Sequence, residues 1–212
     1  MAVRMTQPLT DEQARFPLAG DGLAAADRLA QAGFDARADL GQHFLRSKEA
    51  AHRLLECAEL PAGGQVLEVG AGLGTLSGTV AETGRRIWAV EKDRRLGGIL
   101  QDALRVFGPR ARVSISDVRE VDLDGGLESG SVLLSIMPFD WELSAALTRH
   151  VFASTPKVVR GLVVVPSRTL DQYQAAGQET GALRLREVDG ISRAEFWPKA
   201  PGALRVVSVE RG

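Results

Sequence analysis

The chain has 212 residues, of which 44% are hydrophobic and 25% are charged, and its formal net charge is −1. This composition is typical of one globular α/β domain with a full core, and the length is short for two domains. No apolar run approaches the ~20 residues that cross a bilayer, and the N-terminus lacks a charged-then-apolar leader pattern. We therefore expect a cytoplasmic protein with no membrane insertion.

Cysteine and histidine content limits the chemistry further. Cys57 is the only cysteine, which excludes an internal disulfide. The three histidines have no metal-ligand spacing with one another, so we expect no metal site.

The charge distribution gives mixed information about nucleic-acid binding. The isoelectric point is near 6.3, whereas dedicated nucleic-acid-binding domains are usually strongly basic. Residues 142–212 nevertheless carry ten Lys/Arg against seven Asp/Glu. A modestly basic C-terminal side would contact a few phosphates, but an ordinary solvated surface explains the same count.

The N-terminal region differs from the rest of the chain. Residues 1–20 are polar and contain two prolines, which is typical of an arm, and residues 22–32 fit a short amphipathic helix. We divide the chain into an arm over residues 1–38 and one domain over residues 39–212. Within the domain, Ser47 is a predicted N-cap for the next helix.

The most informative segment runs from residue 66 to residue 74, Val-Leu-Glu-Val-Gly-Ala-Gly-Leu-Gly. An apolar strand leads into Gly70, Gly72 and Gly74, where the backbone can turn sharply and approach a ligand closely. A helix is predicted over residues 75–83. A second strand follows and ends at Glu91, the position from which a carboxylate holds a ribose diol in βαβ units.

Strands and helices continue to alternate after this unit. Alternation predicts a mostly parallel, twisted sheet with helices on both faces, an α/β Rossmann-like fold. The further predicted helices are residues 94–106 and 141–151, and the further predicted strands are residues 112–116, 131–135, 161–165, 183–188 and 204–209. Ligands of such sheets bind at the carboxyl ends of strands, where we expect Glu68, Glu91, Asp117 and residues 135–140 to converge.

The acidic residues near the glycines favour one cofactor class. Glu68 would repel the pyrophosphate of a dinucleotide, but a carboxylate suits the sulfonium and ammonium groups of S-adenosylmethionine. A purely structural turn is the alternative explanation of a lone glycine loop. With Glu68 before the loop and Glu91 after it, we predict S-adenosylmethionine.

Five segments together resemble the ribosomal RNA adenine N6-dimethyltransferase family, which belongs to the class I methyltransferases. They are Gly41-Gln42-His43-Phe44-Leu45, residues 68–74, Glu91-Lys92-Asp93, Asp117 and Phe196-Trp197-Pro198-Lys199-Ala200-Pro201. The glycine loop alone fits any class I methyltransferase, and the segment at residues 41–45 is more specific. The resemblance covers residues 39 to 209.

The resemblance implies a role for each matching residue. His43 and Leu45 would lie along the methionine portion of the cofactor, and Gly70 with its glycine neighbours would pass beneath it. Glu91 would hold the ribose hydroxyls, Asp117 would accept from the adenine amino group, and the Val118 amide would face the ring. The full set of cofactor-binding candidates is Gln42, His43, Leu45, Gly70, Gly72, Gly74, Glu91, Lys92, Asp117 and Val118.

Simpler roles remain open for three of these side chains. The alternative role of Glu91 is to cap the following helix, and that of Asp117 is to serve as a turn carboxylate. His43 would serve equally as a packed loop residue whose backbone alone matters.

The chain departs from the family at the acceptor site. Where the family has Asn-Leu-Pro-Tyr, this chain has Ile136-Met137-Pro138-Phe139. The family Asn accepts a hydrogen bond from the target amine, whereas Ile136 has no side-chain acceptor, so backbone carbonyls at Ile136 and Pro138 would have to position the amine. Phe139 keeps the face on which a flipped base stacks. We take Ile136, Pro138 and Phe139 as the acceptor-site residues.

Three functions follow from this pattern. The first is an S-adenosylmethionine-dependent ribosomal RNA adenine N6-methyltransferase with a divergent fourth motif. The second is an N-methyltransferase for a small molecule, lipid head group or peptide, with Asp140 or Glu142 near the amine. The third is a non-catalytic binder that keeps the cofactor fold. The family's small helical C-terminal domain is expected to be absent, which would remove RNA-binding surface.

Overall fold

The computed structural model describes residues 29–30, 34–61, 63–136, 138, 140–168, 170, 172 and 183–212. Most of the expected arm and of the helix expected at residues 22–32 lies outside the described residues, as do Met137 and Phe139. Leu29 is described, and its side chain is buried.

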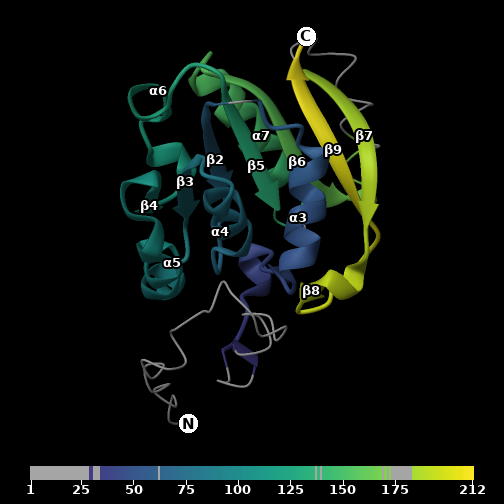
Figure 1. Ribbon diagram of the computed structural model, residues 1–212. Coiled ribbons are helices and arrows are strands. Elements are labelled where there is room, and N and C mark those ends of the chain that lie inside the picture. Colours follow the sequence, from purple (N-terminus) through teal and green to yellow (C-terminus); the bar gives the residue numbers. More distant parts are fainter. Residues whose placement is uncertain are drawn as a thin grey trace.

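Helices and strands alternate along the described chain (Figure 1). The strands are β1 (Phe44–Leu45), β2 (Gln65–Val69), β3 (Arg86–Glu91), β4 (Ala111–Ile115), β5 (Ser131–Ile136), β6 (Val158–Pro166), β7 (Leu183–Ile191), β8 (Phe196–Trp197) and β9 (Leu204–Arg211). The α-helices are α3 (Lys48–Cys57), α4 (Thr75–Glu82), α5 (Gly97–Leu104), α6 (Leu123–Gly126) and α7 (Trp141–Ser154). The short 3-10 helices are η1 (Ala38–Leu40), η2 (Arg94–Leu96), η3 (Arg105–Arg110), η4 (Val118–Glu120) and η5 (Arg193–Glu195).

The main sheet of the described residues has seven strands in the order β4-β3-β2-β5-β6-β9-β7. The first five strands are parallel, and β9 and β7 are antiparallel additions at one side. The predicted mostly parallel sheet is confirmed, and each predicted strand lies within an observed one or differs from it by one residue.

Helices cover both faces of this sheet. Apolar side chains of α3 and α4 pack on one face against Val66 and Val132, and α5 packs beside them against Ala89. On the opposite face α6 and α7 pack against Leu67 and Leu133. The carboxyl ends of the parallel strands lie at the lower edge in Figure 1, where η1, β1 and β8 also gather.

Capping explains where two helices begin. Ser47 Oγ accepts from the Ala50 amide at 3.1 Å, so the predicted N-cap of α3 is confirmed. Asp140 Oδ1 accepts from the Leu143 amide at 2.8 Å and starts α7.

The helical segment predicted over residues 94–106 is confirmed, although it is not one α-helix. The segment is divided into η2, α5 and η3. Asp93 caps the first turn, and the adjacent Gly97 and Gly98 weaken helical continuity there. At the other end Gly108 adopts a φ of 55° and Pro109 follows it, so the helix cannot run on.

A second, two-stranded sheet was not predicted from the sequence. β1 pairs with β8 in antiparallel fashion, with Phe44 opposite Trp197 and Leu45 opposite Phe196. This pairing brings the segment at residues 41–45 against a segment about 150 residues later in the chain. Both segments had been selected for their resemblance to one family, and here they are in contact.

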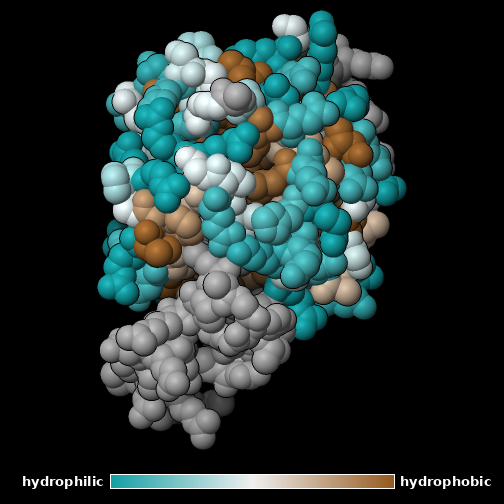
Figure 2. Space-filling view, in the orientation of Figure 1, coloured by the Kyte–Doolittle hydropathy of each residue, from teal (hydrophilic) through white to brown (hydrophobic). Residues whose placement is uncertain are grey.

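The face of the described residues that Figure 2 shows is mainly hydrophilic. Figure 2 shows hydrophobic residues in separate patches among hydrophilic ones on the face that carries α3 and α4. Among the helices described, none combines the length and apolar character that a bilayer span needs. The described side chains also contain no cluster of His, Cys, Asp and Glu suited to a metal ion.

Candidate functional site

The glycine bend after β2 is built for close packing. Gly70, Gly72 and Gly74 have φ values of 77°, 56° and 80°, which L side chains rarely adopt. A Cβ on Gly72 would lie 3.1 Å from the ring of Phe44, because that ring covers the bend. A Cβ on Gly74 would meet Leu100 at 3.0 Å, so this glycine serves helix packing.

Backbone amides in the bend are already engaged. Gly70 and Ala71 donate to the Val90 carbonyl at 2.9 and 3.2 Å. Gly72 donates to Glu91 Oε2 at 2.8 Å, and Gly74 donates to the Ala71 carbonyl at 2.9 Å. A phosphate-binding loop needs such amides for its anion, so this bend is poorly suited to a pyrophosphate.

Glu91 ends β3 beside the bend. Its two carboxylate oxygens accept from the amides of Asp93 and Gly72 at 2.7 and 2.8 Å. Burial raises the pKa of Glu91, and these hydrogen bonds oppose the rise. The alternative role of helix cap is filled by Asp93, whose Oδ1 accepts from the Arg95 amide at 3.0 Å.

Asp117 lies beyond the end of β4 and is held by two cations. Arg119 binds both of its carboxylate oxygens at 2.9 and 2.6 Å, and Lys92 Nζ lies 2.9 Å from Oδ2. Hydrogen bonds from Arg119, together with Lys92, hold the pKa of Asp117 well below its usual range. Asp117 also caps η4, so the turn role suggested from the sequence is real and coexists with its place in the cavity wall.

Glu68 lies one residue before the end of β2, near the carboxyl edge of the sheet as expected. Its side chain is buried inside β2, and Ser77 Oγ donates to its Oε2. Burial raises the pKa of Glu68 to about 8, because ionisation in an apolar surrounding is unfavourable. Glu68 therefore faces helix α4 while still bordering a small cavity.

Two adjoining cavities lie at the carboxyl ends of the strands. The larger extends over the acidic ends of β3 and β4, and the smaller extends beneath the segment at residues 43–45. The larger one is lined by residues 40–44, Val69, Gly70, Gly72, residues 90–92, residues 116–119, Ile136, Pro138, Leu143 and Leu147. The smaller one is lined by residues 43–45, Glu68, residues 70–73, Thr75, Leu76 and Ile136.

These linings bring together nearly all the described residues selected from the sequence. Among the cofactor-binding candidates, only Gly74 lines neither of the two cavities. Ile136 borders both cavities and Pro138 borders the larger one. Phe139 lies outside the described residues. Their binding roles stay predictions, because the geometry gives their positions alone.

The segment at residues 41–45 is fixed by side-chain hydrogen bonds. Gln42 donates through Nε2 to Asp93 Oδ2 at 2.7 Å and accepts at Oε1 from the Arg37 amide at 2.9 Å, so its amide orders the loop. His43 Nδ1 lies 2.7 Å from the Pro198 carbonyl. Burial lowers the pKa of His43, which favours a neutral ring that donates from Nδ1.

The acceptor segment follows β5. Ser135 Oγ donates to the Val69 carbonyl at 2.6 Å, which ties this strand end to the glycine bend. Ser144 Oγ lies 2.6 Å from the Pro138 carbonyl and 2.7 Å from that of Asp140. The Pro138 carbonyl is thus already an acceptor, and the Ile136 carbonyl faces Gly70, 3.7 Å from where a Cβ would stand.

Three contributors to the site were missed from the sequence. Arg119 binds Asp117, Ser144 binds the Pro138 carbonyl, and Glu195 binds Arg46 and Ser47 directly after the segment at residues 41–45, but none of the three belongs to a recognisable motif. Arg119 and Ser144 lie two and six residues from their partners, so their contacts are local in sequence. Glu195 lies 148 residues from Ser47, and only the fold brings the two together.

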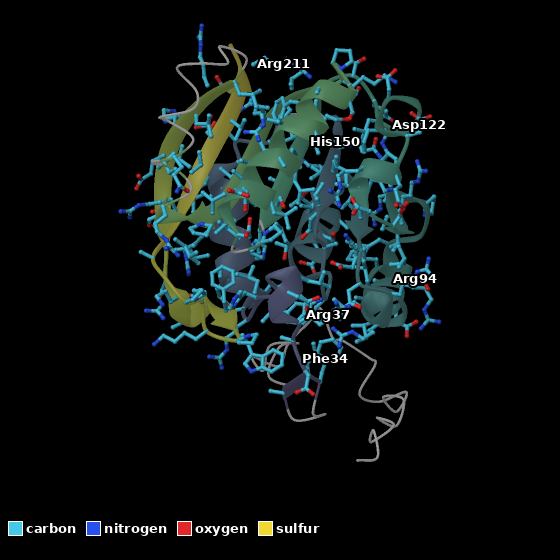
Figure 3. The ribbon with its side chains drawn as sticks, turned by 180° about the vertical axis from the view of Figure 1, so that it is seen from behind. Phe34, Arg37, Arg94, Asp122, His150 and Arg211 are labelled. Atoms are coloured by element: carbon cyan, nitrogen blue, oxygen red, sulfur yellow. The ribbon has the colours of Figure 1, made fainter. Side chains whose placement is uncertain are left out.

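Arginine side chains surround this end of the molecule. Figure 3 shows Phe34, Arg37 and Arg94 at one end, with Arg211, His150 and Asp122 toward the other. Arg37 pairs with Asp39, and Arg95 pairs with Asp93 at 2.6 Å. The cationic side chains that line the larger cavity itself are Lys92 and Arg119, next to Glu91 and Asp117.

Comparison with known proteins identifies the family. Residues 33–179 match the family described as ribosomal RNA adenine dimethylase. "Ribosomal RNA small subunit methyltransferase A" of Thermotoga maritima is 34% identical, over 93% of this chain and 73% of that protein. The protein of the same name from Opitutus terrae is 43% identical over 41% of this chain and 31% of its own length. The matches thus span from about a third to three quarters of these relatives.

A solved structure shares the fold. The 23S rRNA methyltransferase ErmE superposes with a TM-score of 0.65 at 20% identity, covering 80% of this chain and 70% of that one. This likeness supports the Rossmann-like methyltransferase fold, and the sequence match decides the family. The chain belongs to the ribosomal RNA adenine dimethylase family.

Proposed function

We propose that this protein is an S-adenosylmethionine-dependent N-methyltransferase that methylates the exocyclic amine of adenine in ribosomal RNA. The observation that carries the proposal is the cavity that joins the glycine bend, Glu91 and Ile136 at the strand ends of a chain from this family. The named relatives are ribosomal RNA methyltransferases, which supplies the substrate class.

The residues present fit this cofactor. The amides of the bend are used within the protein, which disfavours a phosphate-bearing cofactor and suits one without phosphate. Each oxygen of Glu91 accepts one backbone amide and keeps a lone pair for a ribose hydroxyl. Glu91 and Asp117 would bind the ribose and the adenine amine, and the segment at residues 43–45 would border the methionine portion.

Charge at the two ends of the cavity differs in a way that suits the same cofactor. The smaller cavity borders Glu68, whose ionised form would be favoured by a nearby ammonium or sulfonium. At the other end Asp117 stays ionised through Arg119 and Lys92 and is ready to accept a hydrogen bond. S-adenosylmethionine, when bound, supplies an electrophilic methyl group.

The chain's own contribution to methyl transfer is positioning. The adenine amine is a poor nucleophile because its lone pair is delocalised, so acceptors that align it with the methyl group accelerate transfer. With Ile136 in place of Asn, backbone carbonyls must serve, and Ser135 and Ser144 hold the segment that carries them. Leu143 and Leu147 of α7 add apolar side chains to the wall of the larger cavity.

The same departure supports a second candidate function. An aliphatic amine is nucleophilic once deprotonated and depends less on a side-chain acceptor than adenine does. The aliphatic side chain of Ile136 at the cavity border is the specific observation in favour of an N-methyltransferase for a small molecule, lipid head group or peptide.

Labelled S-adenosylmethionine separates these functions. The protein is incubated with it and with ribosomal RNA, a metabolite and lipid extract, or a peptide pool. Label in adenine of RNA is the expected result. Label confined to another pool would replace the first function by the second, and cofactor binding without transfer to any pool would indicate a non-catalytic protein.

A further inference from the structure

A segment near the C-terminal end of the chain lies against the predicted cofactor site. Glu195 ends η5 and immediately precedes β8, and residues 192–200 carry none of the cofactor-binding candidates. Its backbone carbonyl accepts from the Arg46 amide at 2.8 Å. Its carboxylate accepts from Ser47 Oγ at 3.1 Å and from Arg53 at 2.9 Å.

These contacts hold the chain directly after the segment at residues 41–45. Arg46 and Ser47 directly follow β1, and Ser47 is also the N-cap of α3. One carboxylate therefore binds the residue that joins the cofactor loop to its supporting helix. The side chain of Glu195 is 26% exposed, so water weakens these bonds only in part.

The two-stranded sheet of β1 and β8 connects the Glu195 segment to the glycine bend. Phe44 pairs with Trp197 across the ladder, and their rings stack with centroids 6.2 Å apart. The ring of Phe44 also lies against Gly72, because a Cβ added to Gly72 would be 3.1 Å from a ring carbon of Phe44. Gly72 in turn donates to Glu91. An unbroken series of contacts thus runs from Glu195 to the carboxylate expected to hold the ribose.

His43 gives a second connection between the same two segments. Its Nδ1 lies 2.7 Å from the Pro198 carbonyl, on the residue that follows β8. Residues 195–198 therefore hold the loop at two points, and the position of the His43 ring depends on that segment.

We propose that Glu195 is a positioning residue for cofactor binding, acting through Ser47 and the β1–β8 ladder on the segment at residues 41–45. This inference rests on the proposed function, since it assigns Glu195 to the S-adenosylmethionine site. Glu195 itself does not line either cavity, so its effect must pass through the loop.

The test measures the affinity for S-adenosylhomocysteine by calorimetry, together with KM and kcat on ribosomal RNA. Glu195→Ala removes the acceptor of Ser47 and Arg53 and is expected to raise the dissociation constant by about tenfold. The KM for S-adenosylmethionine should rise in parallel, while kcat at saturating cofactor stays close to wild type. Glu195→Gln keeps an acceptor for Ser47 and should restore most of the affinity.

Glu187→Ala is the matched control, because Glu187 pairs with Arg205 at 3.3 Å on β7 and β9 and lines neither cavity. It should leave the affinity unchanged. If Glu195→Ala does not fold, Trp197→Leu decides, because it removes the ring that stacks on Phe44 and is expected to weaken binding severalfold.

Unchanged affinity in Glu195→Ala, or in Trp197→Leu where Glu195→Ala does not fold, would overturn the inference alone. Equal losses in Glu195→Ala and Glu187→Ala would overturn it as well. Wild-type protein that binds neither S-adenosylmethionine nor its demethylated product would overturn the proposed function, and the inference with it.

Discussion

The amide of Gly72 donates to Oε2 of Glu91 over 2.8 Å, which joins the bend after β2 to the end of β3. The other oxygen of the same carboxylate accepts from the Asp93 amide at 2.7 Å. One side chain thus sets the spacing between two strand ends and retains lone pairs toward the larger cavity. This relationship makes the cofactor site sensitive to changes in either partner.

Glu91→Ala should therefore weaken cofactor binding and loosen the bend at once. The substitution removes the ribose acceptor and leaves the buried amides of Gly72 and Asp93 without their partner. We expect the dissociation constant for S-adenosylhomocysteine, measured by calorimetry, to rise by about tenfold or more. Glu128→Ala, which removes a half-exposed surface partner of Arg86, is the control and should bind as wild type. Equal affinity in Glu91→Ala would show that the ribose lies elsewhere.

Gly72→Ala tests the contact with Phe44. The added Cβ would meet the ring at 3.1 Å, at a backbone φ of 56° that is unfavourable for alanine. Gly84→Ala is a close match, because Gly84 has a φ of 84° but nothing within 4 Å of the added Cβ. Both variants should lose thermal stability, and only Gly72→Ala should also lose cofactor affinity. A loss of affinity in both would mean that backbone strain alone, without the Phe44 contact, explains the effect.

The local part of the architecture could be predicted from the sequence. Val66 to Gly74 combines an apolar run with glycines at positive φ, and both features act between neighbouring residues. Ser47 as a helix cap is local in the same sense. Such signals gave the alternation of strands and helices, and nearly all of the described site residues chosen from the sequence line one of the two cavities.

The remaining part depends on contacts between distant residues. The pairing of Phe44 with Trp197 has no periodic signal, because each strand is two residues long. Glu68 lies one position before the end of β2. Its side chain is enclosed only because α4, which carries Ser77, packs over it. Asp117 could be placed at a strand end, but its two cationic partners depend on how the turns fold.

Glu68 should make the stability of the protein depend on pH. Burial raises the folded-state pKa of Glu68 to about 8 from its ordinary value of 4.5, so the folded state holds this proton more tightly than the unfolded state. The contribution of protonated Glu68 to the free energy of unfolding is complete at low pH and is lost as pH rises toward the folded-state pKa. In Glu68→Gln no proton can be lost at this position.

Melting temperatures of the wild type and of Glu68→Gln at several values between about pH 5 and about pH 9 isolate this contribution. The wild type should lose stability relative to the variant as pH increases. Glu128→Gln, at a partly exposed carboxylate on the surface, should follow the wild type over the same range. A constant difference between wild type and Glu68→Gln would mean that Glu68 is already ionised in the folded protein.

Ile136→Asn tests whether the missing acceptor limits methyl transfer. The variant places a side-chain oxygen at the end of β5, where Ile136 borders both cavities. A single preorganised hydrogen-bonding group of this kind stabilises a transition state by about 2.7–4 kcal/mol in oxyanion holes, which sets an upper bound for the gain here. If adenine is the substrate, kcat on ribosomal RNA should increase while the affinity for S-adenosylhomocysteine stays the same. Ile136→Val changes the shape of the side chain without adding an acceptor and should give no gain. Turnover on RNA that stays flat in Ile136→Asn, with cofactor binding intact, would argue that the cavity next to Pro138 receives an amine other than that of adenine.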